Sequence, residues 1–376
     1  MIASPLDGAV LYVSPDLERF VLPLTASAPA QTRVVAYTVD GEPEPVGTSD
    51  TSPYTVLAAR APATWGLGNH LAQATAVLDW VGPTVVTDEA GFALAEPPAA
   101  DDLDQNGIPD DPFEALSQPG DCWMTRIVVP GYGNRIVGAV SFEDGATKAL
   151  NDVPVVMVLE SAYEPARKAT VRVPRDVLEP GETGVLLVML GDELSIVFGP
   201  DMATGFGPLP DGESLIAGGQ FVEVSVLVTT DGGATFTELD EARLAANPIR
   251  LTIEGLSFSA GTTQWLHAHS TFVDSNEMGV YIVAEGAAWT TDGVVILEVG
   301  EGTLVADLVS LSVFAPFERG GEGEGEGEGE TPGCLGVSVA AAPPSSPGAR
   351  LGDLAVVLLV AGALLTTGMR NARARQ

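Results

Sequence analysis

The feature that most constrains this sequence is an uncharged apolar run near its C-terminus, residues 354–369. Extending the run back to 351 gives nineteen residues and adds only one charge, Asp353. A helix of that length rises roughly 28 Å, close to the thickness of a bilayer core. Three arginines follow it: Arg370, Arg373 and Arg375. Because positive charge favours the cytoplasmic side, we predict a transmembrane helix over 351–369 and a basic cytoplasmic tail over 370–376. The alternative is a soluble helix buried in a protein core.

A Gly-Glu repeat precedes this segment. Residues 320–330 read GGEGEGEGEGE, and a stretch rich in Ala, Pro and Ser follows to Ala349. Such a composition buries too little apolar surface to offset chain entropy, and its like charges keep the chain extended. We therefore predict a disordered spacer over 319–350, which holds everything before it away from the membrane.

The tail resembles the tripartite C-terminal sorting signals of bacterial surface proteins, in which a short motif, a transmembrane helix and a basic cluster follow one another. Gly333 and Cys334 stand where the motif would lie. The resemblance covers residues 331–376 and implies processing near Cys334 by a membrane protease, with transfer or lipid attachment. The alternative is that Cys334 is an ordinary thiol.

The rest of the chain alternates short apolar runs with turns rich in Gly, Pro and Asp. Eight such runs lie between residues 153 and 299, and another at 308–318 precedes the spacer. Together with 43 glycines and 28 prolines, this pattern favours many short strands rather than long helices. We predict an all-β region over 118–318, either one large sandwich or two small ones, with one short helix within 236–247.

The N-terminal part has a similar pattern. In 70–80 the even-numbered residues, His70 to Trp80, form the better core face of a strand. The segment resembles bacterial immunoglobulin-like domains over about residues 3–80. The matching residues are Val35, Tyr37, Val39-Asp40-Gly41, Val46-Gly47, Pro53-Tyr54 and Gly68-Asn69-His70-Leu71. The resemblance implies an immunoglobulin-like β-sandwich over 1–96, with no catalytic residues and with His70 as a packed or turn residue.

An acidic linker, 97–117, separates the two regions and contains the sequence DDLDQNGIPDDPFE. Its spacing lets short side chains and one carbonyl surround a cation, with Gly107 at the sharp turn. The predicted ligands are Asp102, Asp104, Asn106, the Ile108 carbonyl and Asp110. The loop resembles those of thrombospondin type 3 repeats and dockerins, which implies a structural calcium ion. The twelfth position is Phe113 instead of a bidentate acid, so we expect weak affinity. The alternative is a solvated acidic linker.

Charge and motifs limit the possible functions. A net charge of −34 argues against nucleic acid as a partner. No catalytic motif is present. His267 and His269 would share one face of a strand, as a metal pair or as an ordinary exposed strand face.

We therefore expect a membrane-anchored bacterial cell-surface protein with a non-enzymatic adhesive, binding or structural role. The alternative is an exported carbohydrate-active or other hydrolase with an unmarked carboxylate active site. The candidate partners are the membrane, a sorting protease, and a polysaccharide or another surface protein. Residues 1–13 lack the basic and apolar regions of a secretory leader, which predicts a truncated or mis-started reading frame.

Overall fold

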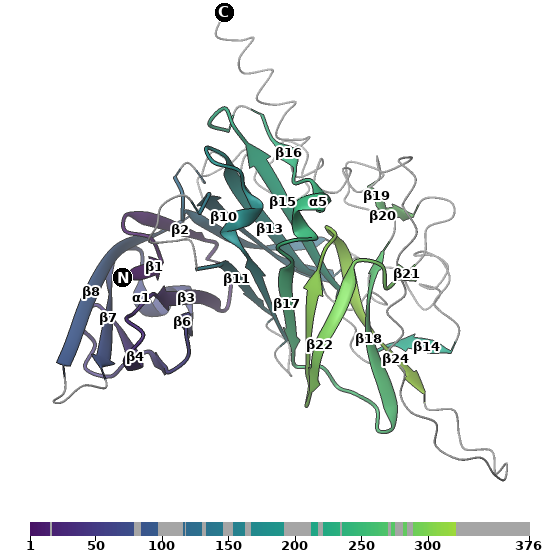
Figure 1. The fold of residues 1–376 in the computed structure, drawn as a ribbon, viewed down its shortest axis with the longest axis horizontal. Coiled ribbons are helices and arrows are strands. Elements are labelled where there is room, and N and C mark those ends of the chain that lie inside the picture. The colour runs from purple at the N-terminus through teal and green to yellow at the C-terminus, as the bar shows by residue number, and fades with distance from the viewer. Residues whose placement is uncertain are drawn as a thin grey trace, which may run out of the picture.

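The fold is known from a computed structural model of the chain (Figure 1). The structure describes residues 1–15, 17–78, 84–96, 116, 118–129, 133–145, 153–161, 167–191, 212–216, 221–233, 235–269, 272–274, 281–283 and 289–320. Within these ranges nearly all regular structure is β-strand, so the predicted all-β class is confirmed.

Residues 2–95 form a sandwich of two sheets. One sheet has the order β1-β3-β6, with β1 Ile2–Ser4, β3 Phe20–Ala26 and β6 Tyr54–Arg60. The other runs β2-β8-β7-β4-β5, with β2 Ala9–Val13, β8 Thr84–Ala95, β7 Gly68–Leu78, β4 Thr32–Val39 and β5 Gly47–Ser49. One short helix, α1 Pro62–Trp65, precedes β7. This is the immunoglobulin-like architecture that the resemblance implied.

The strand β7 shows why the sequence folds in this way. Its burial alternates, and the even positions from His70 to Leu78 face the core as predicted. His70 packs as expected: its ring stacks on Phe92 at 5.3 Å, and its Nδ1 lies 2.7 Å from Asp40 Oδ2. Trp80 lies outside the described residues.

Residues 122–320 form a larger sandwich. Its first sheet continues β9-β10-β13-β15-β24-β18-β21, with β9 Cys122–Val129, β10 Gly133–Glu143, β13 Thr183–Gly191, β15 Phe221–Thr229, β24 Ser312–Gly320, β18 Thr262–His269 and β21 Trp289–Thr290. Two short strands extend it, β14 Glu213–Leu215 on β24 and β16 Thr237–Glu238 on β15.

The second sheet of this sandwich has five strands in the order β11-β12-β17-β23-β22. Their bounds are β11 Val155–Glu160, β12 Lys168–Val173, β17 Ile249–Glu254, β23 Thr303–Leu308 and β22 Val294–Gly300. Val171, Leu251 and Ala306 point inward and are fully buried against the first sheet. A two-stranded hairpin, β19 Phe272–Asp274 with β20 Tyr281–Val283, and two short helices, η1 Arg175–Val177 and α5 Glu241–Leu244, complete the described elements.

The two sandwiches share a sheet through β2. This strand pairs in parallel with β8 on one side, where Leu11 faces Leu94, and with β9 on the other, where Leu11 faces Cys122. One sheet of each sandwich therefore belongs to a single 14-stranded sheet (Figure 1). Parallel pairing of this kind joins segments far apart in sequence, and nothing in the local pattern of residues 9–13 predicted it.

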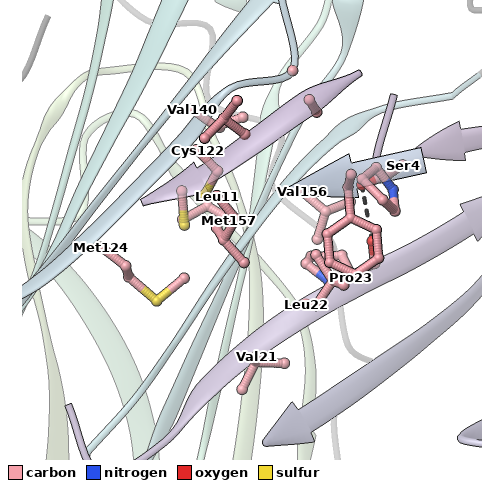
Figure 2. Close-up of a pocket in the computed structure, with 15 residues that line it drawn as sticks. Ser4, Leu11, Val21, Leu22, Pro23, Cys122, Met124, Val140, Val156 and Met157 are labelled. Atoms are coloured by element: carbon pink, nitrogen blue, oxygen red, sulfur yellow. Dashed lines mark hydrogen bonds between the residues drawn. The ribbon is translucent and has the colours of Figure 1, made fainter. Parts of the chain in front are cut away.

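The sandwiches also share a core. Every residue of β3 is buried, because one of its faces packs inside the first sandwich and the other lies against β11. Val21 and Pro23 of β3 meet Val156 of β11 at a cavity of about 40 Å³ between the sandwiches (Figure 2). A cavity of this size holds only a few water molecules.

Seven of the eight predicted apolar runs between 153 and 299 contain or overlap strands, and the eighth, 194–200, lies outside the described residues. The last strand begins and ends later than the predicted range, 308–318. Leu308 ends β23, and β24 begins at Ser312 and continues to Gly320. The predicted helix within 236–247 is one turn, α5, capped by the Asp240 carboxylate, which accepts from the Ala242 N–H.

In the described part of the chain, no helix is both long enough and apolar enough to cross a bilayer. The predicted transmembrane helix and the tail with Arg370, Arg373 and Arg375 lie outside those residues.

Candidate binding face

The residues predicted to bind calcium and to direct sorting lie outside the described part of the chain. These are Asp102, Asp104, Asn106, Ile108 and Asp110 for calcium, and Gly333 and Cys334 for processing. Among the residues that the structure does describe, no group of three or more His, Cys, Asp or Glu side chains is arranged to hold a metal ion.

His267 and His269 do share one face of β18, as predicted. That face is not exposed, however: the two residues are 4% and 1% exposed. His267 Nε2 lies 2.5 Å from Glu213 Oε2 of β14, and both side chains are buried. The expectation of an ordinary exposed strand face was therefore wrong, because strand alternation does not reveal what covers the outer side of a sheet.

Aromatic rings surround the two histidines. His267 meets Phe317 edge-on at 4.7 Å, Trp289 meets Phe317 at 5.1 Å, and His269 meets Trp289 at 5.0 Å. Such contacts stabilise packing. The Glu213–His267 pair ties the short strand β14 across β24 to β18, so we assign this cluster a structural role.

A different surface is open. The five-stranded sheet turns one face to the other sheet and the opposite face outward. The register of its strands aligns Val156, Arg172, Arg250, Asp307 and Val295 in one row from β11 to β22. The β11 end of this row is covered, because Val156 lies at the junction cavity and the neighbouring Val158 and Thr170 are buried. The open part of the row runs from Arg172 to Val295. We call this outward surface the arginine face. It is formed by Arg172, Arg250 and Asp307 with the outward residues of the same strands.

Most charged side chains on or beside the arginine face are paired. Arg250 Nε and Nη2 donate to Asp307 Oδ1 and Oδ2 at 2.9 and 3.3 Å. Lys168 Nζ lies 2.6 Å from Glu254 Oε2, and Arg19 lies 3.3 Å from Glu160. These are cross-strand or junction contacts that hold the sheet and the first sandwich in register.

Arg172 is the exception. It stands directly opposite Arg250 and is half-buried, and among the described residues its guanidinium makes no ion pair and no hydrogen bond. Burial, and then the positive charge of Arg250, lower the pKa of Arg172. No sequence signal could have found this pair, because 78 positions (250 − 172) separate the two arginines along the chain.

The charge balance of this face differs from that of the chain. Arg19, Lys168, Arg172 and Arg250 are matched there by Glu160, Glu254, Asp307 and Glu298. The whole chain has 17 basic residues against 51 acidic ones. The arginine face is thus locally close to neutral on a strongly acidic protein, and Arg172 forms no ion pair with any described residue.

The cavity at the junction offers different chemistry. It is lined mostly by apolar side chains, including Leu11, Leu22 and Met157, and by the Cys122 thiol (Figure 2). Burial, and then the carboxylate of Asp121, raise the pKa of Cys122 to about 12. A thiol with so high a pKa stays protonated and unreactive at neutral pH. Cys122 is therefore a packing residue.

No protein-family model and no curated protein matches this chain. Among solved structures, fibronectin(III)-like modules of Clostridium thermocellum CbhA are similar at 15% identity and a TM-score of 0.20, covering 25% of this chain and 92% of that one. Carbohydrate-binding modules of a β-sandwich superfamily are similar at 10% identity and a TM-score of 0.18, covering 85% and 94%.

A third similar structure is Bacteroides ovatus SGBP-B of a mixed-linkage glucan utilization locus, in complex with a mixed-linkage heptasaccharide. It has 10% identity and a TM-score of 0.18, and the match covers 85% of this chain and 99% of that one. Scores this low carry no argument about function. The sandwich assignment for the present chain rests on its own strand pairing.

Proposed function

We propose that this chain is a membrane-anchored cell-surface protein whose fused sandwiches have a non-enzymatic binding or structural role. The observation that carries the proposal is the arginine face: an outward sheet surface on which Arg172 makes no ion pair with any described residue, built on the strands of a sandwich. Sites placed on rigid strands hold their geometry better than sites on loops, which suits a protein that must hold a partner.

The anchoring part of the proposal rests on the sequence. The apolar run 351–369, the arginines after it and the Gly-Glu spacer before it would display the sandwiches at a distance from the membrane. A structural calcium ion at Asp102, Asp104, Asn106, Ile108 and Asp110 would stiffen the acidic connection between the two sandwiches.

The alternative, an exported hydrolase, requires two carboxylates in a cleft that raises the pKa of one of them. The junction cavity has no carboxylate in its lining. This cavity therefore gives no support to the hydrolase, and we propose the binding or structural role.

Localisation tests the proposal directly. Cells expressing the full gene are fractionated, and intact cells are treated with an external protease. We expect the protein in the membrane fraction and its sandwiches to be cleaved from intact cells, while a cytoplasmic marker survives. A variant with Leu358→Arg and Leu359→Arg should leave the membrane fraction. Recovery of intact wild-type protein from the cytosol would refute the proposal.

Thermal melting tests the calcium ion. We expect a higher Tm in millimolar calcium than in EDTA, and no such difference in a double variant with Asp102→Ala and Asp104→Ala. A wild-type Tm that is indifferent to calcium and EDTA would remove calcium from the proposal and leave the anchoring part intact.

A further inference from the structure

We infer that Arg172, together with Arg250, binds an oxyanion group, a carboxylate or a sulfate, of an acidic polysaccharide. This inference rests on the proposed function, because it names the ligand class of the same face.

Arg172 and Arg250 place two positive charges directly opposite each other on neighbouring strands. Like charges directly opposite on neighbouring strands destabilise a sheet, and half-burial of a cation adds a desolvation cost. Arg172 meets both conditions and makes no ion pair in the described part of the chain. A bound anion between the two guanidinium groups would remove both costs. The position therefore fits a ligand site better than it fits a purely structural one.

The two guanidinium groups offer more N–H donors than Asp307 accepts from. A guanidinium has five N–H donors in a planar fork that matches the oxygens of a carboxylate or sulfate. Asp307 occupies only the Nε and Nη2 groups of Arg250. Within the described part of the chain, its Nη1 group and the whole guanidinium of Arg172 are left for a ligand, so one oxyanion can accept from both arginines.

The described strands of the arginine face lack the aromatic side chains that bind neutral sugars. Neutral sugar rings present apolar C–H surfaces that bind by packing on aromatic rings, whose faces carry partial negative charge. The outward residues on the five described strands of this sheet include no Phe, Tyr or Trp. Recognition on this face must therefore come from charge and hydrogen bonding.

The length of the arginine face favours a polymer. The row from Arg172 to Val295 crosses four strands, roughly 14 Å at the usual strand spacing. It is part of a sheet surface, and the Thr252 and Thr303 side chains point to the same side in the neighbouring rows. A surface of this shape contacts an extended chain over several units, whereas a small anion would use only its centre.

The net charge of −34 sets the conditions for binding. At low salt the field of the whole protein repels an acidic polymer, whereas at physiological ionic strength charges interact over only about 8 Å. The attraction by two adjacent arginines acts within that range. The experiment is therefore done at physiological ionic strength.

The test is affinity electrophoresis of the purified full-length protein in gels that contain one polymer each. Polygalacturonate supplies carboxylates, dextran sulfate supplies sulfates, dextran is the neutral control, and polyglutamate is a carboxylate polymer without sugars. We expect retardation by at least one acidic polysaccharide and none by dextran. Whichever of polygalacturonate and dextran sulfate retards the protein more identifies the oxyanion.

Variants locate the site. Arg172→Gln should weaken binding about tenfold, the loss expected for one charge-assisted hydrogen-bond pair. Arg33→Gln removes the same charge from an exposed position of β4 on the first sandwich and should change binding less than twofold. Asp307→Asn should strengthen binding severalfold, because it frees Arg250. Since Arg172→Gln removes a like-charge contact, its Tm should equal or exceed that of the wild type.

Several results would overturn the inference. These are no retardation of the wild type by either acidic polysaccharide, retardation by polyglutamate alone, and equal binding by the wild type and Arg172→Gln. Each leaves the proposed function standing if the sandwiches are cleaved from intact cells. Binding by purified protein that is found only in the cytosol would support the oxyanion site and refute surface display.

Discussion

Glu318 shows how a single buried carboxylate holds a turn to a strand in this protein. It is 8% exposed and accepts hydrogen bonds from the Ser259 N–H at 2.9 Å, the Ser259 hydroxyl at 2.7 Å and the Thr262 hydroxyl at 3.1 Å. Burial opposes its charged form, but the hydrogen bonds from Ser259 and Thr262 outweigh burial and hold the pKa of Glu318 below its usual value.

This lowered pKa predicts an acid-sensitive contribution to stability. A carboxyl whose pKa is lower in the folded state stabilises fully above its unfolded pKa, about 4.3 for Glu, and loses that contribution as the pH falls through the folded value. We expect Glu318→Gln to reduce the free energy of unfolding by about 1–2 kcal/mol at pH 7, and by progressively less below pH 4.

Urea denaturation at several pH values measures this difference. Glu42→Gln, at an exposed position of the first sandwich, serves as the control and should change the free energy of unfolding by less than about 0.5 kcal/mol. A Glu318→Gln deficit that stays constant from neutral to acidic pH would contradict the assignment.

At the scale of elements, β2 decides how the two sandwiches are joined. Its backbone is also fixed by Asp121, a carboxylate only 2% exposed at the start of β9. Asp121 Oδ1 accepts from the Val10 N–H and Oδ2 from the Gln118 N–H, both at 3.0 Å. One side chain therefore links β2 of the first sandwich to the segment that enters the second.

Replacing Asp121 with Ala leaves two backbone N–H groups without their acceptor. We expect a loss of about 1–3 kcal/mol in the free energy of unfolding, because the half-buried Val10 N–H is left unsatisfied, whereas water can replace the acceptor of the exposed Gln118 N–H. Asp176→Ala, which removes an exposed carboxylate from η1, is the control and should cost little. Guanidinium denaturation followed by tryptophan fluorescence distinguishes the two, and equal losses would show that the link does not matter.

The strand β22 is an edge of the five-stranded sheet with an apolar surface. Val295, Leu297 and Val299 are 54%, 48% and 42% exposed. The pairing with β23 shifts register between Ile296 and Glu298. Such a bulge makes an edge strand less able to pair with a strand of another molecule. Glu298 adds the one charge within this exposed stretch.

Edge strands of this kind promote aggregation, and a charge on the edge suppresses it. We expect Leu297→Lys to slow the aggregation of partly heated protein severalfold, as measured by light scattering, with little change in Tm. Leu71→Lys, at a 43% exposed position of β7, which pairs with β8 on one side and β4 on the other, is the matched control. Equal suppression by both variants would attribute the effect to charge alone and not to the edge.

The sequence predicted most individual strands of this protein but not how they pair. The alternation in β7 and the apolar runs that become β11, β12, β13 and β15 are local patterns. The alternation correctly predicted the core face of β7, and the apolar runs correctly predicted where strands form. Pairing partners are not local, so neither the parallel neighbours of β2 nor the Arg172–Arg250 contact was visible in advance. The burial of His267 depends on what covers the sheet, which alternation cannot report.

At the scale of the whole molecule, the main feature is the large excess of negative charge. A net charge of −34 destabilises a compact chain by self-repulsion. Raising NaCl from about 10 mM to about 150 mM shortens the screening length from roughly 30 Å to roughly 8 Å. We expect Tm to rise by several degrees over this range.

Differential scanning calorimetry measures this shift, and KCl should produce the same rise as NaCl if screening is its cause. A Tm that falls with salt would mean that the paired charges, such as Arg250 with Asp307 and Arg243 with Glu182, outweigh the repulsion.

The strand shared by the two sandwiches also bears on inheritance. Modular surface proteins diversify by exchanging whole domains at their linkers, and residues 97–117 look like such a linker in the sequence. A recombination there would separate β2 from β9 and leave an unpaired strand edge on each sandwich. Genes that encode the two sandwiches should therefore gain or lose both of them together. A sandwich that occurs alone would need another strand to pair with its exposed edge.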